Sequence, residues 1–113
     1  MLESTFKLKE REYFESKGWK FIQLDPGGGS GVPMGFPDTL CLSPNGYSCY
    51  VEWKQHKNSK KQPLQQYWNT ELNNMRHDAF FVYPENVGWW RNEILGKGGS
   101  KWLKRSKNSE HIG

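Results

Sequence analysis

The sequence predicts a small mixed α/β domain with the element order helix, strand, strand, strand, helix, strand. Two observations carry this prediction. Apolar residues recur at helical spacing before residue 18 and after residue 62, whereas the apolar segments at 19–54 and 79–83 have the length and composition of strands. A chain of 113 residues is also long enough for one domain with a single modest core. Because the central hairpin is apolar, we expect helices to cover both faces of a central mixed sheet.

The N-terminal half supplies the first helix and three strands. Residues 4–17 read as an amphipathic helix, because Phe6, Tyr13 and Phe14 fall on one side and Gly18 follows its end. The segment 25–37, DPGGGSGVPMGFP, is expected to be a mobile loop. The strands are expected over three ranges, 19–24, 38–42 and 47–54.

The C-terminal half begins with a second helix. Pro63 suits the first helical position, and the predicted apolar side consists of Leu64, Tyr67, Trp68, Leu72 and Met75. The stretch AFFVY reads as a short, fully buried strand over 79–83, and NVGWWRNEIL after it as a short third helix or turn. We therefore predict one domain over 1–95, followed by a basic, flexible tail over 96–113.

Composition narrows the class of protein. Six tryptophans and an aromatic content of 15% argue against disorder in the body of the chain. No apolar run is long enough to span a bilayer, and the N-terminus lacks the apolar stretch of a signal peptide, so we expect a soluble, cytoplasmic protein without membrane contacts. Cys41 and Cys49 have no metal-binding spacing, and we expect them to be reduced thiols.

The tetrapeptide Ser43-Pro44-Asn45-Gly46 determines which hairpin residues face each other. Serine, proline and glycine occupy the positions that a type I turn with a glycine bulge prefers. In that hairpin Ser43 faces Tyr47, and Asp38 lies opposite Glu52 on the same face as Lys54. Two charged residues at the far ends of apolar strands thus come together with a lysine.

Opposed carboxylates repel each other and are costly on a half-buried strand, unless a positive charge lies between them. A divalent cation beside Lys54 removes that cost. Oxygen ligands without a Cys or His cluster favour Mg²⁺ or Mn²⁺, with Asp38 and Glu52 as ligands and the main-chain carbonyl of Trp53 as a further one. The alternative, judged from the hairpin alone, is a surface ion pair between Glu52 and Lys54 on an edge strand.

The glycine-rich loop does not fit a nucleotide cofactor. The stretch GGGSGVPMG lacks the Gly-Lys-Ser/Thr ending of a Walker A loop and the spacing GxGxxG, and a strand rather than a helix follows it. Its glycines would let a substrate backbone approach Asp38 closely, and a plain flexible connector explains them equally well.

Basic residues cluster in two segments, although the net charge is only +4. Residues 54–61, KQHKNSKK, hold four lysines and no acid, and the tail from 96 holds five basic residues and one glutamate. Such clusters suit a phosphate backbone, with Lys57, Lys60 and Lys61 as contacts that do not read sequence. Solvated loops would look the same.

Three motifs occur in order along the chain: Gly-x-Pro-Asp at 35–38, Glu-x-Lys at 52–54 and Pro-x-Gln-x-x-Trp at 63–68, followed by a hydrophobic strand. This series resembles the VRR-NUC family of PD-(D/E)xK nucleases. A glutamate early in the first helix is also typical, and Glu3 fits better than Glu10. The resemblance covers roughly residues 3–83. The glycine-rich loop and the tail depart from the pattern.

The resemblance implies the small α-β-β-β-α-β core of restriction-endonuclease-like proteins and a Mg²⁺- or Mn²⁺-dependent endodeoxyribonuclease. Asp38, Glu52 and Lys54 would carry the chemistry, Gln65 would hydrogen-bond the attacking water or the lysine, and Glu3 would assist. Stand-alone members associated with phages imply a homodimer that cuts branched DNA such as Holliday junctions. Two alternatives stay open: a sequence-specific or nonspecific nuclease, and a non-cleaving DNA-binding module of the same fold.

Overall fold

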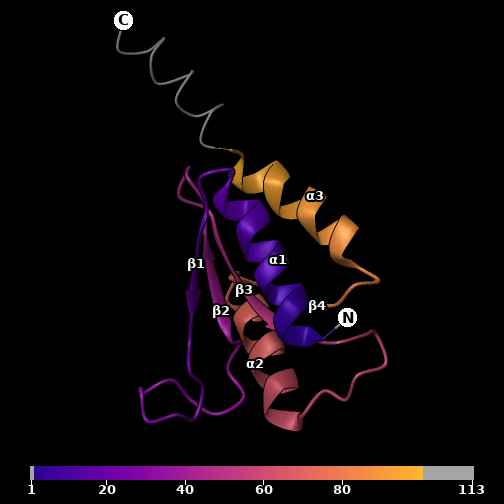
Figure 1. The fold of residues 1–113 in the computed structure, drawn as a ribbon. Coiled ribbons are helices and arrows are strands. Elements are labelled where there is room, and N and C mark those ends of the chain that lie inside the picture. The colour runs from indigo at the N-terminus through magenta and orange to yellow at the C-terminus, as the bar shows by residue number, and fades with distance from the viewer. Residues whose placement is uncertain (1, 101–113) are drawn as a thin grey trace, which may run out of the picture.

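Helices and one mixed sheet make up the part of the chain that the structure, a computed structural model, describes, residues 2–100. The elements follow one another in the predicted order, and the stretch predicted as a third helix or turn is a helix (Figure 1). In chain order they are α1 (Glu3–Glu15), β1 (Lys20–Gln23), β2 (Thr39–Leu42), β3 (Ser48–Trp53), α2 (Pro63–Asn74), β4 (Asp78–Val82) and α3 (Val87–Gly98).

The sheet has the strand order β1-β2-β3-β4, with antiparallel pairs except for the parallel pair β3 and β4. Its hairpin register is the predicted one: Thr39 pairs with Val51 and Cys41 with Cys49. The N–H of Ser43 donates to the carbonyl of Tyr47 at 2.8 Å. Gly46 takes φ of 94°, which the glycine bulge requires.

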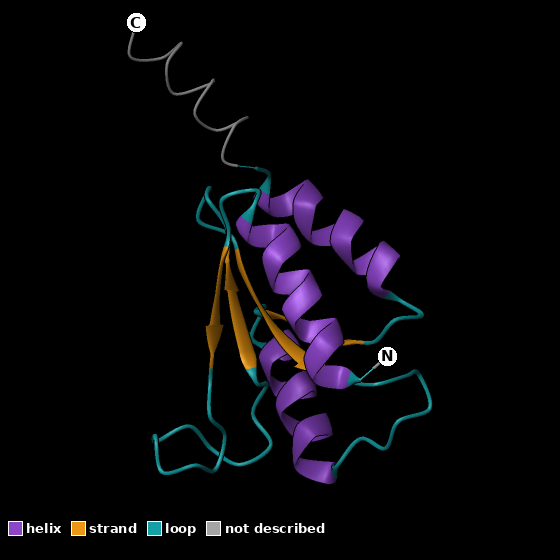
Figure 2. Ribbon diagram, in the orientation of Figure 1, coloured by secondary structure: helices purple, strands orange, loops and turns teal. Residues whose placement is uncertain are grey.

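The core lies between one face of the sheet and helices α1 and α3, which cross that face side by side (Figure 2). Phe14 of α1 is at its centre, with ring centroids 5.1 Å from Trp90 of α3 and 5.4 Å from Phe21 of β1. The ring centroid of Trp53 of β3 lies 5.5 Å from that of Trp90. Full burial of one such ring stabilises the fold by roughly 1.5–3 kcal/mol. The buried Cys41 and Cys49 lie in this core as free thiols.

Helix α2 packs on the opposite face, and less of it is buried than predicted. Of its five predicted apolar residues only Leu72 is fully buried. Trp68 packs on Phe36, whereas Leu64, Tyr67 and Met75 are about half exposed. The prediction was wrong for these three because, among the strands, α2 packs mainly against β4. On the same face of the sheet, Ile22 and Leu42 are also exposed within residues 2–100.

The last two elements also differ from the prediction. Strand β4 is an edge strand that pairs only with β3, so Ala79 and Val82 are buried but the residues between them are half-buried. Helix α3 continues to Gly98, three residues beyond the predicted end. Its last turn packs under Trp19, whose Nε1 donates to the carbonyl of Gly99 at 2.9 Å. The predicted tail from residue 101 onward lies outside the described residues.

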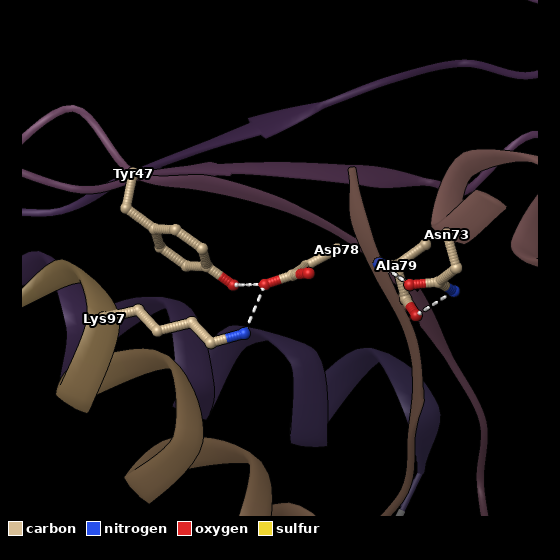
Figure 3. Close-up of polar contacts among 5 residues, drawn as sticks. All are labelled: Tyr47, Asn73, Asp78, Ala79 and Lys97. Atoms are coloured by element: carbon tan, nitrogen blue, oxygen red, sulfur yellow. Dashed lines mark hydrogen bonds and ion pairs between the residues drawn. The ribbon is translucent and has the colours of Figure 1, made fainter. Parts of the chain in front are cut away.

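A polar cluster joins three elements at the turn end of the hairpin (Figure 3). The hydroxyl of Tyr47 and the ammonium of Lys97 both donate to Oδ2 of Asp78, at 2.6 and 2.7 Å. Burial opposes ionisation of Asp78, but these two hydrogen bonds outweigh it and lower its pKa. The cluster attaches α3 to the sheet at the end remote from Asp38.

Candidate active site

Asp38 and Glu52 meet at the open end of the hairpin. Asp38 directly precedes β2, and the register that pairs Thr39 with Val51 places it opposite Glu52. The carbonyl of Asp38 accepts from the N–H of Leu24 at 2.8 Å, which ties its backbone to the chain leaving β1. Its carboxylate accepts from the Thr39 hydroxyl at 2.9 Å, and that hydroxyl is held in turn by Nε1 of Trp53 at 2.8 Å. The carboxylate is therefore positioned by strand geometry and by a core tryptophan.

The pKa values of both carboxyl groups are raised. Burial and the adjacent charge of Asp38 raise the pKa of Glu52 from 4.5 to about 8, against the opposing charge of Lys54. Burial also raises the pKa of Asp38, although Lys7 and the Thr39 hydroxyl counteract it. Both carboxyl groups are therefore harder to ionise than they would be in water, mainly because they are partly buried.

Lys54 lies directly beyond β3, with its side chain on the same face as Glu52. It is only 9% exposed, and its main-chain N–H donates to the carbonyl of Val82 at 2.8 Å. Its ammonium donates to Oε1 of Gln65 at 2.7 Å and to the carbonyl of Lys60 at 3.1 Å. Both acceptors are neutral, so the positive charge stays available to an anion. This geometry does not fit the alternative of a surface ion pair, and no ion pair within residues 2–100 involves Lys54.

Gln65 joins the start of α2 to the carboxylates. Its Oε1 accepts from Lys54 and from the N–H of Gln62 at 3.1 Å, and its Nε2 donates to Oε2 of Glu52 at 3.4 Å. With Pro63 at the first helical position, Gln62 and Gln65 form a reciprocal cap. Gln65 therefore both caps the helix and orients Lys54.

Helix α1 begins at the end of the sheet where β3 ends (Figure 1). Glu3 and Lys7 lie one helical turn apart in its first half. The charge of Glu3 raises the pKa of both Asp38 and Glu52, and Lys7 has the opposite effect on Asp38. Sequence reasoning missed Lys7, although its position four residues after Glu3 was a signal. Glu10, the weaker candidate, is 1% exposed and its oxygens accept from Arg91 at 2.6 and 2.8 Å.

The oxygens at this end of the sheet suit a hard divalent cation. Within the described residues no three Asp, Glu, His or Cys side chains come together as a metal-ligand set. Asp38 and Glu52 are a pair of adjacent carboxylates. The main chain of Trp53 hydrogen-bonds to Asp38, and the N–H and C=O of one strand residue point to the same side, so the Trp53 carbonyl faces the site as well. Mg²⁺ commonly takes few protein oxygens and keeps several waters. The residues present therefore fit such an ion.

Comparison with known proteins decides the fold. No family model and no curated protein sequence matches the chain. A solved structure described as "VRR_NUC domain" matches 86% of this chain and 96% of that chain, with a TM-score of 0.66 and 24% sequence identity. The chain has the VRR_NUC fold. The fold that the motifs implied is thereby confirmed, and α3 is the helix of the predicted third helix or turn.

In this VRR_NUC fold the basic segment is the loop that connects β3 to α2. Lys57 and Lys60 are exposed, and Lys61 lies with its ammonium 5.3 Å from the ring centroid of Phe81. The main-chain N–H of Lys57 donates to Glu85 at 3.3 Å. The loop is joined to the site through the Lys60 carbonyl that accepts from Lys54. No helix in residues 2–100 has the length and apolarity needed to cross a membrane.

The raised pKa of Glu52 predicts an unusual pH dependence for the metal-free protein. A folded-state pKa of about 8 lies above the ordinary value of 4.5, so folding retains a proton that the unfolded chain releases. The stabilisation is complete below pH 4.5 and is lost as the pH rises to about 8. Glu52→Gln keeps the shape without the charge. We expect this variant to be more stable than the parent at pH 8 by about 1–2 kcal/mol, since solvent reaches part of the carboxyl and screens the effect.

Thermal unfolding in EDTA at pH 4 and pH 8 measures the difference. At pH 4 the two proteins should unfold at similar temperatures, and at pH 8 the variant should unfold higher by roughly 5 °C. Mg²⁺ added at pH 8 should stabilise the parent more than the variant. The exposed Glu12 provides the control Glu12→Gln, for which no pH-dependent gain is expected. An equal gain for both variants would assign the effect to net charge rather than to this site.

Proposed function

We propose that this protein is a Mg²⁺- or Mn²⁺-dependent endonuclease that hydrolyses phosphodiester bonds in DNA. One observation carries the proposal: Asp38 and Glu52 lie opposed at the open end of the hairpin, next to a buried lysine that forms no ion pair within residues 2–100. A protein that only binds a polyanion gains nothing from two partly buried acids facing its ligand. The VRR_NUC fold and the basic loop support the proposal.

Each residue has a role that follows from its contacts. A divalent cation held by Asp38, Glu52 and the Trp53 carbonyl would polarise the scissile phosphate and lower the pKa of an attacking water. Lys54, oriented by Gln65 and the Lys60 carbonyl, offsets the negative charge that builds up on the phosphate in the transition state. Gln65 also donates a hydrogen bond to Glu52, so one side chain holds both this carboxylate and Lys54 in position. Glu3 sets the charge of the site from the first turn of α1.

The proposed substrate is branched DNA, bound through its backbone. Lys57, Lys60 and Lys61 lie on the loop next to Lys54 and would contact phosphates without reading bases. The described residues form one small α/β unit with no separate element for insertion into a groove, which favours recognition of DNA shape. Two copies acting as a homodimer would cut two strands of a junction.

The experiment that tests this proposal offers the protein four labelled DNAs: a four-way junction, a nicked duplex, a single strand and a linear duplex. Each is incubated with Mg²⁺, Mn²⁺ or EDTA, and binding is followed by gel shift. We expect cutting with either metal, none in EDTA, and a preference for the junction. Discrete cuts at one short motif in linear duplex would favour a sequence-specific enzyme. Binding without cutting under any metal would favour the non-cleaving module.

A further inference from the structure

An apolar cleft opens beside the proposed catalytic residues, between the glycine-rich loop and the start of α2. Its volume is about 460 Å³. Six residues line it: Met34, Gly35, Gln62, Pro63, Leu64 and Gln65. None of them is charged, and its two large apolar side chains, Met34 and Leu64, are 67% and 48% exposed. Such exposed apolar surface in a concave site indicates a ligand.

The glycine-rich loop can approach α2 closely only because residue 35 is a glycine. This residue has φ of 84°, and a Cβ added there would lie 2.4 Å from Cβ of Leu64 and 2.7 Å from its carbonyl carbon. Only glycine allows this contact without a shift of the backbone. Phe36, the next residue, packs edge-on against Trp68 of α2 and Tyr50 of β3. The loop is thereby seated on α2 and the sheet just before Asp38.

The cleft and the catalytic residues share Gln65. This side chain lines the cleft and also contacts Lys54 and Glu52. On the loop side of the cleft, Gly35 precedes Asp38 by three residues. A phosphate positioned by Asp38, Glu52 and Lys54 would therefore have the sugar and base of a neighbouring nucleotide next to the cleft.

We propose that this cleft receives an unpaired nucleobase of the strand that is cut, an inference that rests on the proposed function. A phosphate does not suit it, because no charged side chain lines it. A base does, since methionine, leucine and proline pack on the flat apolar face of any base, and Gln62 and Gln65 offer hydrogen bonds to its edge. A base in a continuous duplex is stacked and paired and cannot enter without being extruded. The cleft thus selects DNA with an unpaired or easily unpaired nucleotide beside the scissile phosphate.

Fluorescence of 2-aminopurine in place of a base next to the branch point tests the inference in EDTA, where no cutting occurs. A base that leaves the stack for a cleft without aromatic walls gains fluorescence. We expect a severalfold increase on binding of the parent protein and little increase with the double variant Met34→Ser/Leu64→Ser. The control is Met75→Ser, which removes a similarly exposed methionine, 51%, just after the other end of α2. The apolar double variant Met34→Leu/Leu64→Met should retain the increase, which separates lost packing from misfolding.

Cleavage rates supply the second readout. With Mg²⁺, the parent should cut faster beside an unpaired nucleotide than in fully paired duplex. The serine double variant should reduce the ratio of these two rates about tenfold, and Met75→Ser should leave the ratio unchanged. Unchanged fluorescence and unchanged preference in the serine double variant would overturn the inference while leaving the nuclease in place. If the parent binds DNA without cutting it, the proposed function fails, and the fluorescence still decides whether the cleft takes a base.

Discussion

Asp38→Asn is expected to reduce DNA cleavage by on the order of 10²–10³-fold while DNA binding is kept or strengthened. Asparagine keeps the size of the side chain and an oxygen for the Thr39 hydroxyl, so the local fold is retained. It removes one of the two charges that would hold a cation. It also removes a negative charge that faces the phosphate backbone, so the affinity for DNA should not fall.

Lys54→Met is expected to give a loss of similar size through a different cause. The carboxylates remain, so metal binding should persist, but the charge that Gln65 orients toward the phosphate is gone. Single-turnover cleavage of the junction and gel shifts in EDTA measure both variants. Metal titration separates them, because only Asp38→Asn should need more Mg²⁺.

Asp78→Asn is the matched control for the aspartate. Asp78 also contacts a lysine, Lys97, but at the opposite end of the sheet (Figure 3). We expect the Asp78→Asn variant to cut DNA at the parent rate. Equal activity of Asp38→Asn and the parent would exclude Asp38 as a metal ligand. Equal losses in Asp38→Asn and Asp78→Asn would indicate damage to the fold instead.

Arg91→Ala is expected to lower the free energy of unfolding by roughly 3–4 kcal/mol, the largest stability effect that we predict. Arg91 of α3 holds both oxygens of the buried Glu10 of α1, and its guanidinium lies 4.5 Å from the ring centroid of Tyr13. The hydrogen bonds to Glu10 raise the pKa of Arg91. Removal of the Arg91 side chain leaves the Glu10 carboxylate in the core without these two hydrogen bonds. A domain of this size has only about 5–15 kcal/mol of stability in total.

Urea unfolding measures the loss, with Arg11→Ala as the control. Arg11 also contacts a glutamate of α1, Glu15, but those side chains are 53% and 40% exposed, and such a pair contributes at most about 1 kcal/mol. The double variant Glu10→Met/Arg91→Met should recover most of the stability, because apolar side chains can replace a buried ion pair. A loss for Arg91→Ala no larger than that for Arg11→Ala would mean that water reaches Glu10.

The hairpin and its opposed acids could be predicted from the sequence because they depend on local chemistry. Ser43, Pro44 and Gly46 specify one turn, and in a ladder the turn decides every pair up to Asp38 and Glu52. The spacing of 2 along β3 then places Lys54 on the same face as Glu52. The element order followed for the same reason, since helical and strand periodicities are properties of short segments.

Only the tertiary structure decided what surrounds those residues. It determined that Gln65 contacts both Lys54 and Glu52, that Lys7 lies near Asp38 while Glu10 lies in the core, and that half of α2 is exposed. The cleft between Met34 and Leu64 likewise forms only where the loop meets α2. These contacts join residues far apart in the chain, and they depend on which helix covers which part of the sheet. Periodicity identifies the apolar side of a helix, but the partner that covers it is determined by the packing of the whole domain.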